Sequence, residues 1–148
     1  MMQFQVKAFH ELTATELYEI LRARNEVFLL EQGIVCLDTD GVDYRALHVF
    51  AMESGRITAY LRAFSDEECP DTVMIGRVLS HTRGRGVGKA LMQHAMRAIA
   101  TRIPCQRFAL HAQCHAAGFY EKCGFRAVGT PFMEEGVAHI LMETETIL

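Results

Sequence analysis

Three glycines at alternate positions constrain this chain more than any other feature of its sequence. They lie in Arg83-Gly84-Arg85-Gly86-Val87-Gly88-Lys89, between a predicted strand and a predicted helix. Glycines at such a junction let the backbone adopt positive φ angles and approach a ligand closely. The free N–H groups and the dipole of the first helical turn favour negative charge at that point. The pattern therefore predicts a phosphate-binding loop in a domain that contains both strands and helices.

Two well-known glycine loops do not match this segment. The dinucleotide pattern G-x-G-x-x-G/A would place Lys89 or Leu91 at its third glycine, depending on where it begins. A P-loop ending in Gly88-Lys89 would need glycine and a hydroxyl residue where the chain has Arg83 and Ala90. A glycine-rich turn followed by a solvated basic helix start remains the alternative to a phosphate site.

Charge is distributed unevenly along the 148 residues, although the formal net charge is only −3. Residues 1–71 contain six basic and 13 acidic side chains, residues 72–120 contain seven basic and no acidic ones, and residues 121–148 contain two and five. The acid-free middle contains the glycine loop, so it favours an anionic ligand there. The near-neutral total argues against a nucleic-acid partner, because nonspecific nucleic-acid binding needs a strongly basic chain.

Hydrophobic periodicity and turn residues predict one domain over residues 1–148, of mixed α/β or α+β class. Strands are predicted at 4–9, 47–53, 56–64, 72–80, 107–112, 125–128 and 137–143, and helices at 14–28, 87–103 and 116–123. Thr13 and Glu16 have the spacing of a capping box at the start of the first helix. The acidic stretch 33–45 is predicted to be a loop.

Cysteine usage and the first residues indicate the compartment. Five cysteines, an odd number without close paired spacing, argue against a disulfide framework and against a zinc cage. No basic segment followed by an apolar one opens the chain, and no apolar run is long enough to span a bilayer. We therefore expect a cytoplasmic protein with reduced thiols and no membrane partner.

The histidines and the acidic loop do not match a metal-binding motif. Counting from Asp38, the glycine of a calcium loop should fall at the sixth position but falls at the fourth, and the twelfth position is Val49, which cannot ligate. His111 and His115 lack the glutamate of an H-E-x-x-H pair. No metal cofactor is expected.

Two segments resemble motifs of the GCN5-related N-acetyltransferase (GNAT) superfamily. Arg83, Gly86 and Gly88 match its Q/R-x-x-G-x-G/A loop, and residues 113–125 resemble its late motif, in which a helix carries a tyrosine ahead of a Gly-Phe turn. The chain also resembles the ElaA-like branch of this superfamily over nearly its whole length. The residues that carry this resemblance are Arg24, Val27-Phe28, Glu31-Gln32, Asp38, Asp40-Gly41, Asp43, Gly76-Arg77-Val78, Ala112-Gln113, His115, Phe119-Tyr120, Gly124-Phe125, Glu134, Gly136 and His139.

The resemblance implies the GNAT fold, a mixed and mostly antiparallel central sheet flanked by helices and splayed where acetyl-CoA enters. It implies transfer of an acetyl group from acetyl-CoA to a primary amine of a small acceptor within a ternary complex. The residues implied to bind the cosubstrate are Val78, Leu79, Arg83, Gly84, Arg85, Gly86, Val87, Gly88 and Lys89. The segment between Val78 and Arg83 is shorter than is usual in the branch, which leaves open which backbone group of Val78 to Ser80 contacts the thioester. Val78 or Leu79 is the expected contact.

Tyr120 matches the general acid of the family. A phenol, with a pKa of about 10, can return a proton to a departing thiolate, whose thiol has a pKa of about 8.5, at modest cost. A base must also take a proton from the amine, whose pKa is about 10.4. Glu31 and His139 are the candidates for the base or for acceptor binding, with His111 and His115 as further candidates for the base. The alternative for Tyr120 is a core aromatic, and for each histidine a structural hydrogen bond.

Three points stay open on the sequence alone. Asp38, Asp40 and Asp43 either draw a cationic amine toward the thioester, together with Glu31 and Glu134, or form a solvated turn. A CoA-binding sensor without turnover is the alternative to an enzyme. Homodimers are frequent in the family, but no residue pattern here decides whether this chain forms one.

Overall fold

The computed structural model describes residues 2–81 and 84–145. These residues form one seven-stranded sheet in the order β1-β2-β3-β4-β5-β7-β6. The strands are β1 (Gln5–Ala8), β2 (Leu47–Glu53), β3 (Arg56–Ser65), β4 (Thr72–Ser80), β5 (Arg107–Gln113), β6 (Arg126–Glu134) and β7 (Val137–Glu145). The helices are α1 (Ala14–Arg24), α2 (Val87–Arg102) and α3 (Ala117–Lys122), with a π-helical turn at Asn25–Glu31 and 3-10 turns at Phe9–Glu11, Val42–Arg45 and Cys114–Ala116. The predicted mixed, mostly antiparallel sheet flanked by helices is confirmed.

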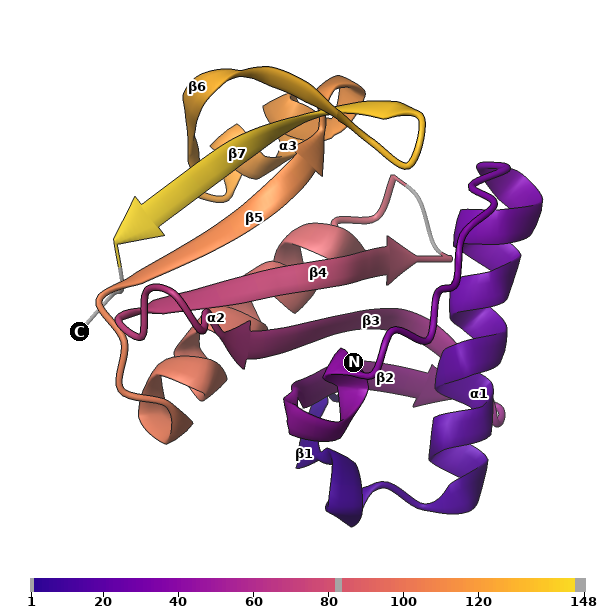
Figure 1. Cartoon of the computed structure of the whole chain (residues 1–148). Helices are drawn as coiled ribbons and strands as arrows, with labels where there is room; N and C mark the ends of the chain where they lie inside the picture. Colours follow the sequence, from indigo (N-terminus) through magenta and orange to yellow (C-terminus); the bar gives the residue numbers. More distant parts are fainter. Residues whose placement is uncertain (1, 82–83, 146–148) are drawn as a thin grey trace.

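Two hydrophobic clusters lie on opposite faces of the sheet. On one face α2 contributes Leu91 and Ile99 to a core with Leu61 of β3. On the other face α1 contributes Ile20 to a smaller core with Tyr60 of β3. Adjacent residues of β3 thus serve different cores, because successive side chains of a strand point to opposite faces. Figure 1 shows α2 behind β3 and β4, and α1 crossing the near side of the sheet.

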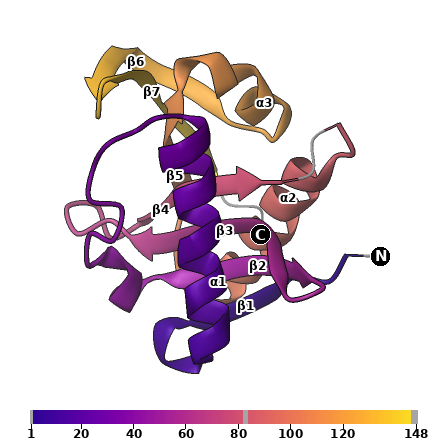
Figure 2. The ribbon, with the colours of Figure 1, turned by 90° about the vertical axis from the view of Figure 1, so that its right-hand side faces the viewer.

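Strands β4 and β5 form the one parallel pair among the described strands, and they separate after three paired positions. The pairs run from Thr72 with Arg107 to Met74 with Ala109. Beyond these positions β5 pairs only with β7, as far as Gln113 with His139. Figure 2 shows β6, β7 and α3 together at one end of the sheet, apart from the strands that α1 crosses. The edge of β4 after Met74 therefore faces a gap rather than a neighbouring strand.

A β-bulge in β4 adjoins this gap. Tyr60 of β3 is paired with Leu79, and Arg62 is paired with Gly76, so two residues of β4 lie opposite one residue of β3. Arg77, one of the two, has a φ angle of +54°. Bulges of this kind bend a strand and increase its twist, so the bulge contributes to the divergence of β4 from β5.

Several predicted elements are confirmed. Strand 72–80 has the predicted bounds, and the turn at 54–55 joins β2 to β3. The capping box is present: the Thr13 hydroxyl accepts from the Glu16 N–H at 3.0 Å, and Glu16 accepts from the Thr13 N–H at 2.9 Å. No helix of the described residues is long and apolar enough to cross a membrane.

The predicted end of strand 125–128 is wrong, because β6 continues to Glu134. The pairing of β6 with β7 is irregular between Val128 and Phe132, and Gly129 has a φ angle of +77° there. In the sequence, Gly129 and Pro131 predict the end of a strand. In the structure they lie at a bulge within a longer edge strand.

Candidate active site

The glycine loop forms the entrance to α2. Gly86 is the N-cap residue with a φ angle of +69°, and Gly84 has a φ angle of +76°. Both angles are in the left-handed region that favours glycine. Ala90 donates to the Gly86 carbonyl at 3.0 Å, so the N–H groups of residues 87–89 begin the helix without intrahelical partners. This end of α2 therefore has the geometry of an anion site.

The structure places the predicted cosubstrate residues around this helix start. Arg85 and Lys89 are exposed, whereas Val78 lines the adjacent cleft. Leu79 is 4% exposed and packs into the core beneath α1, so only its backbone is available to a ligand. Arg83 lies outside the described residues.

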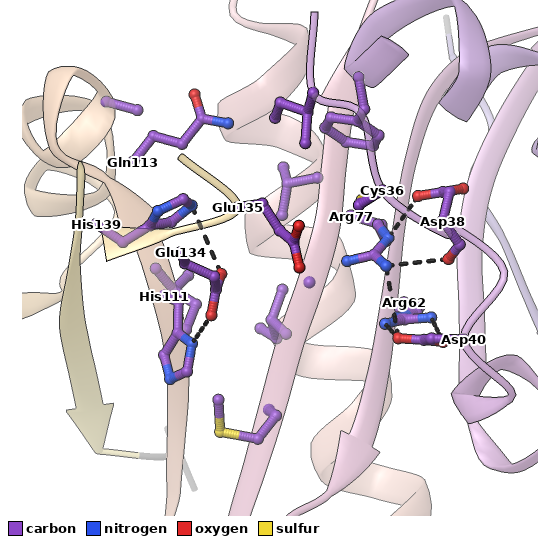
Figure 3. Close-up of a pocket in the computed structure, with 18 of the residues that line it drawn as sticks. Cys36, Asp38, Asp40, Arg62, Arg77, His111, Gln113, Glu134, Glu135 and His139 are labelled. Carbon is purple, nitrogen blue, oxygen red and sulfur yellow. Dashed lines mark hydrogen bonds and ion pairs between the residues drawn. The ribbon is translucent and has the colours of Figure 1, made fainter. Parts of the chain in front are cut away.

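A cleft of about 690 Å³ occupies the gap between β4 and β5. Its lining comes from the segment after α1, from β3 and β4, from β5 and its following turn, and from the β6–β7 hairpin. The volume is in the range of a small-molecule site. Figure 3 shows its two polar walls, with arginines and aspartates on one side and histidines with Glu134 on the other.

The first wall is an ion-pair network. Arg77 Nε lies 2.8 Å from Asp38 Oδ1, and Arg62 Nη2 lies 2.7 Å from Asp40 Oδ2. Arg77 Nη2 also approaches Asp40 Oδ2 at 3.5 Å. Partial burial opposes ionisation of Asp40, but the hydrogen bonds and charge of Arg62 outweigh it and lower the pKa of Asp40 to about 2. Both arginine charges facing the cleft are therefore matched by carboxylates.

A buried layer supports this network. Arg24 is fully buried, and its guanidinium contacts Asp38 through Nε at 2.8 Å and Asp43 through Nη1 at 2.7 Å. Asp43 Oδ1 also accepts from Arg62 Nη1 at 3.0 Å. The three aspartates are not a solvated turn, because their carboxylates bind arginines and Asp43 is buried. Their attraction for a cationic amine stays a prediction. The signal was present in the sequence: Arg62 interrupts the apolar run of β3, and a buried charge needs a partner.

The second wall joins two histidines through one carboxylate. The Val137 carbonyl can only accept, so His139 Nδ1–H donates to it at 2.7 Å, which leaves Nε2 of the neutral ring as an acceptor. This Nε2 lies 3.6 Å from Glu134 Oε2. Glu134 Oε1 in turn accepts from His111 Nδ1 at 2.9 Å. The ring of His139 is nearly buried, and His111 is exposed.

Tyr120 lines the cleft from α3. Its ring packs edge-on against Phe119 and Phe125, with centroids at 5.0 and 6.1 Å. Burial raises the pKa of the Tyr120 phenol, so the hydroxyl keeps its proton at neutral pH. The residue is thus part of the core and also faces the cleft, so its structural and functional roles are compatible.

Glu31 lies apart from these groups. It ends the π-helical turn, is exposed, and is not among the described residues that line the cleft. Its neighbour Gln32 does line the cleft and accepts from Gln113 Nε2 at 2.9 Å. His115 also lines the cleft. The structure therefore brings Tyr120 and His139 to one cleft and places Glu31 outside it.

A sheet that splays at its one described parallel pair, a bulged β4, a glycine loop that opens the following helix and a tyrosine facing the gap define the GNAT class of acetyltransferases. Residues 36–146 match the family model described as an acetyltransferase (GNAT) domain. The chain belongs to this family, and it is related to the ElaA proteins.

Individual relatives agree with this assignment. Protein ElaA of Escherichia coli is 32% identical over 151 residues, with 99% of each chain covered. A UPF0039 protein of Synechocystis is 33% identical over 138 residues, covering 90% of this chain and 89% of that protein.

Solved structures also match. An acyl-CoA N-acyltransferase from Pseudomonas aeruginosa has a TM-score of 0.89 and 34% identity, covering 97% of this chain and 99% of its own. E. coli ElaA has a TM-score of 0.90 and 32% identity, and the match covers 98% of this chain and 100% of the ElaA chain. An aminoglycoside 6'-N-acetyltransferase complexed with coenzyme A shares the fold at a TM-score of 0.74 and 13% identity, covering 97% and 98%.

Proposed function

We propose that this protein is an acetyl-CoA-dependent N-acetyltransferase that acetylates a primary amine of a small acceptor within a ternary complex. One observation carries the proposal: a single cleft is lined by Val78 of the unpaired β4 edge, by Tyr120 and by His139. These residues come from three separate elements, and together they offer a thioester contact, a hydrogen-bond donor and a proton acceptor. The aminoglycoside acetyltransferase of the same fold is complexed with coenzyme A, which agrees with this choice of cosubstrate.

The cosubstrate would lie between the glycine loop and the edge of β4. Its diphosphate would accept hydrogen bonds from the backbone N–H groups at the start of α2, where the helix dipole also favours negative charge. The exposed side chains of Arg85 and Lys89 flank this helix start. The amide groups of the pantetheine would pair with the part of β4 that has no partner strand beyond Met74.

The chemistry uses one proton acceptor and one hydrogen-bond donor. The neutral amine attacks the thioester carbonyl carbon, so a C–N bond forms as the C–S bond breaks. The nitrogen loses a proton to His139 Nε2, whose imidazolium would face Glu134 Oε2. Tyr120 donates a hydrogen bond to the departing thiolate, which takes up one proton from solvent to become the thiol of coenzyme A, while His139 returns the proton of the amine to solvent. Because burial raises the pKa of Tyr120, it acts more as a hydrogen-bond donor than as a strong acid.

Thermal denaturation with acetyl-CoA, followed by thiol release over a panel of amines, tests the proposal. We expect acetyl-CoA to raise the melting temperature and at least one amine to release coenzyme A above the rate without acceptor. Stabilisation without release for every amine would indicate a CoA-binding module instead. Absence of stabilisation would contradict both functions.

A further inference from the structure

The geometry points to an acceptor that carries at least two separated ammonium groups and no carboxylate, such as a linear diamine or polyamine. This inference rests on the proposed function, because it names the substrate class of the same cleft. The acceptor class follows from which carboxylates of the cleft form ion pairs with arginine and which do not.

The described residues that line the cleft carry an excess of negative charge. Five carboxylates face two guanidinium groups, with the histidines counted as neutral. The carboxylates are Asp38, Asp40, Asp66, Glu134 and Glu135, and the guanidinium groups are Arg62 and Arg77. A cleft with three unmatched negative charges attracts cations and repels anions.

The two arginines are already paired with carboxylates. Arg62 binds Asp40 at 2.7 Å, and Arg77 binds Asp38 at 2.8 Å. Arg62 is 4% exposed. An acceptor carboxylate would have to displace one of these aspartates or remain unpaired beside them, and either arrangement is unfavourable.

The remaining carboxylates lie at two levels along the cleft. Asp66 is at the closed end, because its N–H donates to the Thr72 carbonyl, where β4 and β5 are still paired. Its Oδ1 accepts from the Glu68 N–H at 3.1 Å. Among the described residues no cation forms an ion pair with Asp66.

The other level is the β6–β7 turn. Glu134 contacts His111, which lies four residues along β5 from the level of Thr72. Glu135 follows in the turn and points into the cleft between the two walls (Figure 3). At roughly 3.3 Å per residue the two levels are about 13 Å apart. In a diamine, the ammonium group at one end can therefore approach one of these carboxylates while the amine at the other end reaches His139, and a longer polyamine can reach both levels.

Cadaverine and lysine provide a matched comparison, because lysine is cadaverine with one added carboxylate. We expect kcat/KM for cadaverine to exceed that for lysine by about tenfold or more, with lysine methyl ester restoring most of the difference. The preference should weaken as salt is added, because exposed charges are screened. Equal or higher kcat/KM for lysine would overturn the acceptor class and leave the acetyltransferase proposal intact.

Calorimetric binding to the complex with coenzyme A separates the two proposals. Tighter binding of cadaverine than of lysine, without thiol release from either, would support the acceptor class and contradict the transfer reaction. Equal binding without release would contradict both.

The variant Asp66→Asn/Glu135→Gln tests the residues. Asparagine keeps the side-chain acceptor for Glu68 N–H, so the turn is preserved. We expect the cadaverine-to-lysine ratio to fall by about fivefold or more, since two of the unmatched charges are lost. Glu67→Gln is the control, because Glu67 is exposed, pairs with Arg45 and is not among the lining residues. An unchanged ratio in the double variant, or an equal fall in the control, would overturn the inference.

Discussion

Gly88 at the start of α2 lies against the ring of Phe119 in α3, so that a Cβ atom at position 88 would be 3.1 Å from Phe119 Cζ. The helix that would bind the diphosphate thus contacts the helix that carries Tyr120. This contact makes the two motifs of the sequence one structural unit.

Gly88→Ala should fail to stabilise the protein. Alanine gains roughly 1 kcal/mol of helix propensity over glycine, but overpacking against Phe119 costs about 1–3 kcal/mol. Gly118→Ala in α3 is the matched control, because nothing lies within 4 Å of a Cβ atom there. Urea denaturation should show greater stability for Gly118→Ala than for Gly88→Ala. The reverse order would mean that Phe119 moves aside freely.

Tyr120→Phe should lower kcat by about 100-fold and leave stabilisation by acetyl-CoA nearly unchanged, because only the hydrogen bond to the departing sulfur is lost. Thiol-release kinetics and thermal denaturation measure the two effects. Tyr44→Phe is the control, since Tyr44 is exposed and packs against Phe9, with its ring 4.8 Å away. A parallel loss of turnover and cosubstrate binding would instead make Tyr120 structural.

His139→Gln should lower kcat/KM and flatten the acidic side of its pH profile, because a general base must be unprotonated to accept the proton of the amine. Glu134→Gln should alter the same limb less, since it removes only the carboxylate that faces the imidazolium. His10→Gln, at an exposed histidine outside the cleft, is the control. An unaltered acidic limb in His139→Gln would exclude His139 as the base.

Asp43→Ala should destabilise the protein by about 3 kcal/mol, because it removes a partner from the buried guanidinium groups of Arg24 and Arg62. Glu67→Ala removes an exposed partner of Arg45 and should cost less than about 1 kcal/mol. Guanidinium chloride would screen these pairs, so urea denaturation is the suitable measurement. Similar losses for both variants would show that burial does not strengthen the network.

The ionisation of Asp40 makes the free energy of unfolding depend on pH. Its pKa falls from 3.8 to about 2 on folding, so the contribution is complete well above pH 3.8 and is lost as the pH falls through 3.8 toward 2. Urea denaturation at successive pH values should therefore show a smaller loss of stability over this range for Asp40→Asn than for the unaltered protein. An identical slope would indicate that the pKa of Asp40 does not change on folding.

Local signals account for what could be predicted. Strand 72–80 is bounded by Pro70-Asp71 and by the glycine loop, and α1 by its capping box, so each boundary depends on neighbouring residues. Two residues that line the cleft, Tyr120 and His139, could be predicted because the family resemblance covers both. The predicted pattern of strands and helices is confirmed where turn residues separate the elements, except at Gly129 and Pro131, which lie within β6.

Long-range relationships account for what could not be predicted. Arg77 and Asp40 are separated by 37 residues, and Arg62 and Asp40 by 22, so no local spacing indicates their pairing. The π-helical turn after Arg24 continues the apolar periodicity of a regular helix, and therefore it has no separate signal. The cleft-facing position of Glu135 depends on a turn whose pairing is known only from the folded sheet.

The extra residue in β4 changes the face of the sheet to which the side chains after the bulge point. Val73 and Ile75 belong to the core beneath α2, whereas Leu79, which would share their face in a regular strand, belongs to the core beneath α1. The extra residue therefore lets β4 send side chains to both cores, and it also bends the strand away from β5. Deleting Arg77 or Val78 would leave Leu79 opposite Tyr60 and beneath α1, because the alternation between Ile75 and Leu79 would then be regular, but the deletion would remove the bend. In this family member, the bulge is thus a requirement of the cleft rather than of the core.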